Sequence, residues 1–229
     1  MVLLYAALLP SLFLMYRIYQ ADRVEREPVK LIIKVIFFGV LSTIPASVLE
    51  MLGILVLDKF IGNSASILYL VLEFFIVVAF AEEGCKMLAL RIGIWKNPEF
   101  NYLFDGVVYG AASALGFAAF ENVLYVIEGG MPTAIVRAVT AVPLHCICGI
   151  FMGHYYGLAK NADRRGNAEA RKAFKRLGFF IPAFIHGLYD FLASVESDLA
   201  LFLFLAVVIV VDIIAIRHFK RYAMEDIGI

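Results

Sequence analysis

The sequence contains few charged residues for its length. Only 17% of the 229 residues are Asp, Glu, Lys or Arg, whereas 62% are hydrophobic. Soluble domains contain about 25% charged and about 45–50% apolar residues, so this scarcity excludes an ordinary soluble protein. The formal net charge is zero, which provides no general attraction for nucleic acid. We therefore expect a membrane protein that does not bind nucleic acid.

Cysteine is also scarce, and familiar hydrolase motifs are missing. Cys85, Cys146 and Cys148 all lie in apolar segments, so no disulfide framework is expected. No basic residues precede the apolar stretch from Met1 to Met15, so we expect it to be a retained helix. There is no H-E-x-x-H motif and no serine with an obvious His/Asp constellation, which argues against zincin and serine protease mechanisms.

Seven apolar stretches are candidates for membrane-spanning helices, since a span requires about 20 mostly apolar residues. They cover residues 2–16, 31–57, 66–92, 102–127, 133–159, 177–196 and 199–217. The connections are short, apart from a hydrophilic segment between Lys160 and Arg176. We expect an all-α fold, a polytopic transmembrane bundle of about seven helices, forming a single integral membrane domain over residues 1–229.

The basic residues indicate how the helices are oriented. Nearly all of the 20 Lys and Arg residues lie in or beside the first, third and fifth loops and the C-terminal tail. The alternate loops contain only Lys59. Because cytoplasmic loops are enriched in Lys and Arg, the N-terminus should face outward and the C-terminus the cytoplasm. We expect a multi-pass protein of the cell membrane, surrounded by the lipid bilayer.

Four groups of polar residues interrupt the predicted spans, each on a different helix. An ionisable side chain within the bilayer costs about 2.5–3.5 kcal/mol on insertion scales, so each group requires an explanation. The groups are Glu82-Glu83 with Lys86, Glu121 with Asn122, His145, and His186 with Asp190. From a rise of about 1.5 Å per residue, their depths allow all four to meet in one cavity in the middle of the bilayer.

Helix periodicity relates the members of each group. Glu82 and Lys86 are four residues apart, as are His186 and Asp190, so each pair shares a helix face. Glu83 points about 100° away from Glu82. We expect Lys86 to pair with Glu82, which leaves Glu83 freer to face the histidine helices.

Small residues mark helix faces that should pack closely. One stripe is Gly106, Gly110, Ala114, Ala118 and Asn122, and the other is His145, Gly149, Gly153 and Gly157. His154 lies about 180° from His145 and should not share its site. Asp105 is expected to be a solvated residue at a helix start. A structural ion pair is one possible role for each of Glu50, Glu73 and Arg137.

This combination of residues is suited to peptide hydrolysis. A glutamate can deprotonate water, and a histidine can bind a metal or transfer the proton. Asn122 or a second histidine could donate to the oxyanion. The same groups could instead form the proton relay of a coupled transporter, or the polar core of a non-catalytic receptor.

Four short motifs, in order on successive predicted helices, resemble those of a known family. They are E-E-x-x-K at residues 82–86, F-x-x-x-E-N at 117–122, H-x-x-x-G at 145–149 and H-x-x-x-D at 186–190. Together they resemble the PrsW family of bacterial intramembrane proteases, which is distantly similar to the CAAX prenyl protease and Abi group. The resemblance covers about residues 60–195, the expected catalytic core.

The resemblance implies a function and a set of site residues. Such a protease makes the first (site-1) cut in a single-span, membrane-anchored anti-sigma factor of a bacterial cytoplasmic membrane, which leads to sigma-factor release. The residues expected to be required are Glu82, Glu83 and His186, with Glu121, Asn122, His145 and Asp190 as partners.

Whether a metal is needed stays open at this point. Four carboxylates and the Lys86 ammonium leave three negative charges, which require either protonation or a cation. Zn²⁺ held by His145, His186 and a carboxylate such as Glu121 would relieve this charge and could activate water. A metal-free glutamate mechanism with protonated carboxylates satisfies the same balance.

Overall fold

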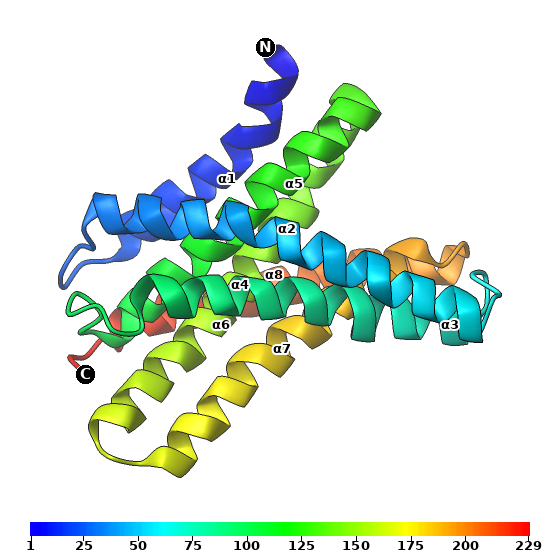
Figure 1. Ribbon diagram of the computed structural model, residues 1–229. Coiled ribbons are helices and arrows are strands. Elements are labelled where there is room, and N and C mark those ends of the chain that lie inside the picture. Colours follow the sequence, from blue (N-terminus) through cyan, green and yellow to red (C-terminus); the bar gives the residue numbers. More distant parts are fainter.

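The computed structural model describes residues 1–229 and confirms the all-α fold. The helices are α1 (Val2–Ala21), α2 (Val29–Phe60), α3 (Ile67–Val71), the π-helix η1 (Leu72–Val78), α4 (Ala79–Ile94), α5 (Leu103–Val139), α6 (Ala141–Arg164), α7 (Ala168–Ser194) and α8 (Asp198–Met224). Figure 1 shows α5 and α6 crossing the middle of the bundle, with the other helices arranged around them. Outside the helices, the only bridge joins Tyr102 to Gly228.

The membrane-spanning character of the chain is borne out. Five helical stretches are long and apolar enough to cross a membrane, and one of them, Leu103–Arg164, contains both α5 and α6. The predicted span 66–92 corresponds to α3, η1 and α4, which follow one another without a break. The protein is therefore a multi-pass membrane protein, with many large apolar side chains on its exterior.

The chain bends back on itself where one long span was predicted at 133–159. Gly130, at φ 70°, interrupts α5, and Arg137 beyond it donates a hydrogen bond to Glu121 before it. A positive φ of this kind is accessible to glycine without steric cost. A second break at Thr140 (φ −125°, ψ −78°) separates this returning segment from α6.

The hydrophilic segment between Lys160 and Arg176 was expected to be a loop, and this expectation is wrong. Most of it is helical, because α6 continues to Arg164 and α7 begins at Ala168. Asn167 caps α7 by accepting a hydrogen bond from the backbone N–H of Ala170. The polar residues therefore extend a helical hairpin beyond the apolar layer, at the lower left of Figure 1.

The ends of the bundle agree with the predicted orientation. In Figure 1 the α1–α2 connection, the α4–α5 connection and the C-terminus lie together at the left. The N-terminus, the tip of α5 and the α2–α3 loop lie toward the top and right. The loops rich in Lys and Arg are thus on the side that carries the C-terminus.

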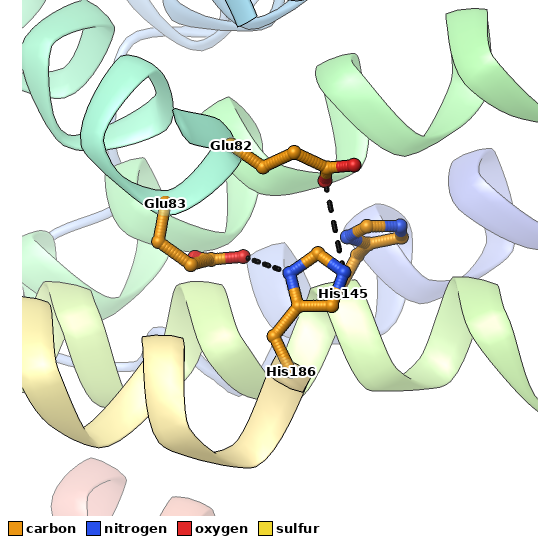
Figure 2. Close-up of side chains that lie close together, drawn as sticks. All are labelled: Glu82, Glu83, His145 and His186. Carbon is orange, nitrogen blue, oxygen red and sulfur yellow. Dashed lines mark hydrogen bonds and ion pairs between the residues drawn. The ribbon is translucent and has the colours of Figure 1, made fainter. Parts of the chain in front are cut away.

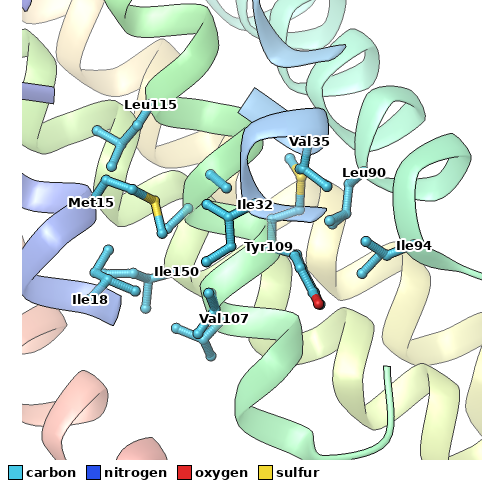
Figure 3. Packing of buried hydrophobic residues seen from close by; sticks show 14 of the residues in the cluster. Met15, Ile18, Ile32, Val35, Leu90, Ile94, Val107, Tyr109, Leu115 and Ile150 are labelled. Carbon is cyan, nitrogen blue, oxygen red and sulfur yellow. The ribbon is translucent and has the colours of Figure 1, made fainter. Parts of the chain in front are cut away.

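The two central helices, α5 and α6, are in close contact at glycine residues. A Cβ atom added to Gly110 would collide with the carbonyl oxygen of Gly149, and one added to Gly153 would collide with that of Gly106. The backbones of α5 and α6 therefore touch, as the two small-residue stripes predicted. Beside this contact lies the largest hydrophobic cluster, of 20 buried residues, between α1, α2, α4, α5 and α6. Figure 3 shows 14 of these residues.

The π-helix η1 leads directly into α4, which carries the Glu82-Glu83 pair. A π-helical turn contains one more residue than an α-helical turn would, and such turns are frequent at functional sites. The backbone of η1 is approached closely by α7, since a Cβ on Gly187 would lie 3.0 Å from the carbonyl oxygen of Phe74. The π-helix thus packs against α7 directly before the helix that carries the Glu82-Glu83 pair.

The structure agrees with the prediction for His154 and contradicts the one for Asp105. His154 stacks on Tyr222 with ring centroids 3.6 Å apart, away from His145, as predicted. Asp105 is fully buried, so its expected solvation is wrong. The reason is a long-range contact: Asp226, from the C-terminal segment, accepts a hydrogen bond from the Phe104 N–H beside Asp105.

Candidate active site

Lys86 lies at the centre of the buried polar site. Its ammonium donates to Glu82 Oε2 at 2.9 Å, to Glu83 Oε1 at 2.8 Å and to His145 Nδ1 at 2.9 Å. The side chain is fully buried and also lies 4.2 Å from the centre of the Phe117 ring. One cation therefore connects both glutamates of α4 to the histidine of α6.

This arrangement revises the expected division between the glutamates. Lys86 was predicted to pair with Glu82 alone, but it binds both carboxylates, because a lysine side chain reaches residues three and four positions before it. Glu83 does face a histidine, as expected, yet it is fully buried and held from two sides. Glu82 is the less restrained of the two.

His186, on α7, is surrounded by carboxylates. Its Nδ1 lies 2.8 Å from Glu83 Oε1, and its Nε2 lies 3.2 Å from Asp190 Oδ2 and 3.8 Å from Glu82 Oε2. Figure 2 shows the ring of His186 between the two glutamates. With these carboxylates ionised, both ring nitrogens must donate, so His186 is an imidazolium. The predicted i, i+4 pair of His186 and Asp190 is present.

His145 begins a second chain of polar contacts. Because its Nδ1 accepts from Lys86, its Nε2 carries the proton and donates to Glu121 Oε2 at 2.9 Å. Arg137 donates to Glu121 at 2.9 Å and to the side-chain oxygen of Asn122 at 2.8 Å. Asn122 in turn donates to the carbonyl oxygen of Ala7. Asn122 thus supports Arg137 and does not face the histidines.

The predicted residues therefore meet, although they come from four different helical elements. The rings of His145 and His186 are 5.1 Å apart at their centroids and nearly perpendicular. Glu82, Glu83 and the two histidines each offer a ligand atom within 4.8 Å of the others, as Figure 2 illustrates. One reacting group could contact several of them at once.

The charge balance is closer to neutrality than the sequence suggested. Arg137 was considered only for a structural ion pair, but it neutralises Glu121, and the His186 imidazolium adds a further positive charge. Four carboxylates then face three cations, which leaves one negative charge. The sequence did not place Arg137 beside Glu121, because the chain reverses direction at Gly130 and this reversal was not predicted. The one indication in the sequence was an arginine without a partner at a depth similar to that of Glu121.

A cavity of about 310 Å³ leads to Glu82 from the outer half of the bundle. It lies between α2 and α5 and is lined by Thr43, Ser47, Glu50, Glu82, Phe117, Phe120, Glu121, Leu124, Tyr125 and Glu128. Glu82 and Glu121 line it, whereas Glu83 and the histidines lie behind them. Glu50 was not assigned to the site from the sequence, because nothing local to α2 links it to the motifs of the other helices.

The donor types fit a metal ion. Two histidines and two carboxylates are a suitable set for zinc, and Glu83 Oε2 is buried without a hydrogen-bond partner. Glu121 is bonded to His145, so it is better placed to orient that ring than to be a third ligand. An ion would share its ligand atoms with the Lys86 ammonium, which contacts three of the four residues.

Comparison with known proteins gives consistent results. The sequence pattern of the PrsW family, described as intramembrane metalloproteases, matches residues 27–216. Protease PrsW of Bacillus subtilis is 33% identical over 194 residues, which are 84% of this chain and 83% of that protein. Protease PrsW of Oceanobacillus iheyensis is 32% identical over 219 residues, or 96% and 95% of the two chains. No solved structure matches the chain.

These similarities cover the whole region that holds the buried site. They identify the enzyme class as a peptidase, so the expected transporter and receptor alternatives are set aside. A protease within the membrane acts on a protein substrate there, and the buried acidic and histidine side chains could hold a metal. With the four motifs and their convergence in space, they lead to one assignment: the chain belongs to the PrsW family of intramembrane proteases.

Proposed function

We propose that this protease makes the first, site-1 cut in a single-span anti-sigma factor, with Glu82 as the residue that activates water. The observation that carries the assignment is the position of Glu82, which lines the outer cavity and also contacts Lys86 and His186. A cavity reached from the outer half suits a cut near the extracytoplasmic surface, where a site-1 protease acts. Cleavage there leads to release of the sigma factor.

In this mechanism Glu82 accepts a proton from water while the water oxygen attacks the scissile carbonyl carbon. Lys86 and the Nε2 proton of His145 supply positive potential for the resulting oxyanion. His186, as an imidazolium, donates a proton to the leaving amine when the C–N bond breaks. The proton held by Glu82 then returns to His186, whose Nε2 is 3.8 Å away, and both groups are restored.

The remaining polar residues keep these groups in position. Glu83 binds both Lys86 and His186, and Asp190 holds the second nitrogen of His186. Glu121 orients His145. If zinc is bound instead, His186 would have to be neutral to offer a nitrogen lone pair. The ion would then be held by His145, His186 and a carboxylate of the Glu82-Glu83 pair, and it would polarise the carbonyl and acidify water.

The test uses the purified full-length protein in liposomes with a single-span anti-sigma factor as substrate. Glu82→Gln, Glu83→Gln and His186→Ala should each abolish cleavage while the protein remains folded. Glu196→Gln, which changes an exposed acid on the α7–α8 connection, is the matched control and should cleave normally. Wild-type activity in all three site variants would refute the assignment.

The metal is tested separately. Metal analysis of the purified enzyme, combined with activity in 1,10-phenanthroline and its non-chelating 1,7 isomer, distinguishes the two mechanisms. Inhibition by the chelating isomer alone, reversed by zinc, is the result expected of a metalloprotease. Equal activity in both isomers, with no metal in the protein, would establish the glutamate mechanism without a metal.

A further inference from the structure

A second buried cluster of carboxylates lies at the cytoplasmic end of the bundle. Asp22 and Glu27 come from the α1–α2 connection, and Asp105 comes from the first turn of α5. Their exposed fractions are 1%, 4% and 0%. Asp105 is 16 residues from Glu121, which corresponds to about 24 Å along α5, so this cluster is distinct from the catalytic site.

The cluster is only partly satisfied by hydrogen bonds. Asp105 Oδ2 accepts from the backbone N–H groups of Asn101 at 2.8 Å and Tyr102 at 2.6 Å. The Tyr109 hydroxyl donates to Glu27. Asp105 Oδ1 and both oxygens of Asp22 are buried and have no partner.

The cluster has no ion-pair partner, although the exposed Arg26 lies close enough for its charge to act on Asp22. None of the three acids forms a salt bridge with Lys, Arg or His. Buried carboxylates are stable only when they are paired, protonated or bound to a cation.

We propose that Asp22, Glu27 and Asp105 bind a hard divalent cation, Mg²⁺ or Ca²⁺. Each residue offers an oxygen atom within 4.8 Å of the other two. Two ligands of one ion are separated by at most twice the ion–oxygen distance, about 4.2 Å for Mg²⁺ and about 4.6–5.2 Å for Ca²⁺. The three oxygens are therefore close enough for one ion to draw all of them into its coordination sphere, with a smaller contraction for Ca²⁺ than for Mg²⁺.

The absence of nitrogen and sulfur donors determines the class of ion. Carboxylate oxygens suit Mg²⁺ and Ca²⁺, whereas zinc sites usually include His or Cys. The ion would join the α1–α2 connection to the start of α5. The C-terminal segment is attached at the same place, since Leu103 N–H donates to the carbonyl oxygen of Ile227. The cation thus joins two segments that are distant in sequence, next to the point where the C-terminal segment is attached.

The proposal is tested by thermal unfolding of the purified full-length protein after removal of metal ions. The three buried free cysteines allow unfolding to be followed with a thiol-reactive fluorophore. MgCl₂ or CaCl₂, compared with NaCl of equal ionic strength, should raise Tm by several degrees in a saturable manner. Whichever ion acts at the lower concentration is the preferred ligand.

Variants assign the effect to the cluster. Asp22→Asn and Asp105→Asn should abolish the cation-dependent rise, and should unfold at a higher temperature than the ion-free wild type because charge repulsion is relieved. Glu25→Gln, an exposed acid in the same connection, should retain the rise. Glu82→Gln should retain it too, which separates this cluster from the catalytic site.

Direct binding provides a second measurement that does not depend on stable variants. Tb³⁺, a luminescent substitute for Ca²⁺, should bind to the Glu82→Gln protein and be sensitised by Tyr109, with displacement by Ca²⁺. No saturable change in Tm and no displaceable Tb³⁺ emission would overturn the proposal and show that protons compensate the cluster. An equal rise of Tm in Asp22→Asn would overturn it as well.

Discussion

At the scale of single residues, Lys86 takes the central position among two glutamates and a histidine. Removing one partner of a buried ion pair costs about 3–5 kcal/mol, because the remaining charge is left without compensation. Lys86→Met should therefore abolish cleavage and lower stability by about this amount. The measurement is Tm in detergent together with the cleavage rate.

The control for this change is Lys172→Met, which removes an exposed lysine on α7 and should leave both quantities unchanged. Lys86→Arg keeps the charge but places a planar guanidinium in a site built for a compact ammonium. It should recover stability in part. Wild-type Tm and activity in Lys86→Met would contradict the central role of this cation.

Part of this residue network was predictable from the sequence. Depth and helix face bring Glu82, His145 and His186 together, and a spacing of four predicts the contact of His186 with Asp190. The connection of Lys86 to His145 was not predictable, because it spans 59 positions and depends on how α4 packs against α6. The spacing of residues in the sequence predicts contacts within one helix, but not contacts between helices.

At the scale of helical elements, the contact of α5 with α6 depends on glycine. Gly153→Val would place methyl groups against the backbone of Gly106. Overpacking of this kind costs about 1–3 kcal/mol, and separation of the helices would displace His145 on α6. We expect a lower Tm and reduced cleavage, measured in parallel.

Gly84→Ala is the matched control, because the nearest atom to a Cβ there is Phe179 Cε2 at 3.6 Å. Alanine is favoured over glycine within a helix by about 0.5–1 kcal/mol, so this variant should unfold at the same or a higher temperature. If both variants lowered Tm equally, close packing of α5 on α6 would not be the cause.

Element boundaries show why some features escaped prediction. Apolar runs located the membrane-spanning helices, because the length of a span is set by the bilayer thickness. The return of the chain after Gly130 was missed, because an apolar run in a sequence is compatible with one straight helix or with two segments that run in opposite directions. Helix continuation past Lys160 was missed because polar residues at a membrane boundary are compatible with either a loop or a helix.

At the scale of the whole molecule, we propose that a substrate reaches Glu82 through the cavity between α2 and α5, which Glu82 lines. Ser47 is an exposed residue of α2 that lines this cavity. Ser47→Trp should fill part of the space and lower kcat/KM by about tenfold, which corresponds to about 1.4 kcal/mol. Tm should change little, because the added ring occupies a cavity and displaces no core side chain.

Val48→Trp is the comparison, because Val48 is exposed beside Ser47 but does not line the cavity. Cleavage of the single-span substrate should be normal in this variant. Equal losses in the two variants would indicate a general effect of tryptophan on α2, and would locate substrate entry elsewhere.

The π-helix Leu72–Val78 also limits how this gene can change over time. Loss of one codon in that stretch would convert the π-helical turn to an ordinary α-helical one and rotate everything before it by about 100° relative to α4. Either the Glu82-Glu83 pair would turn away from His186, or the α2–α3 connection would have to be rebuilt. During evolution, one apolar residue in this stretch can therefore replace another, whereas the deletion of a single residue would disturb the buried site.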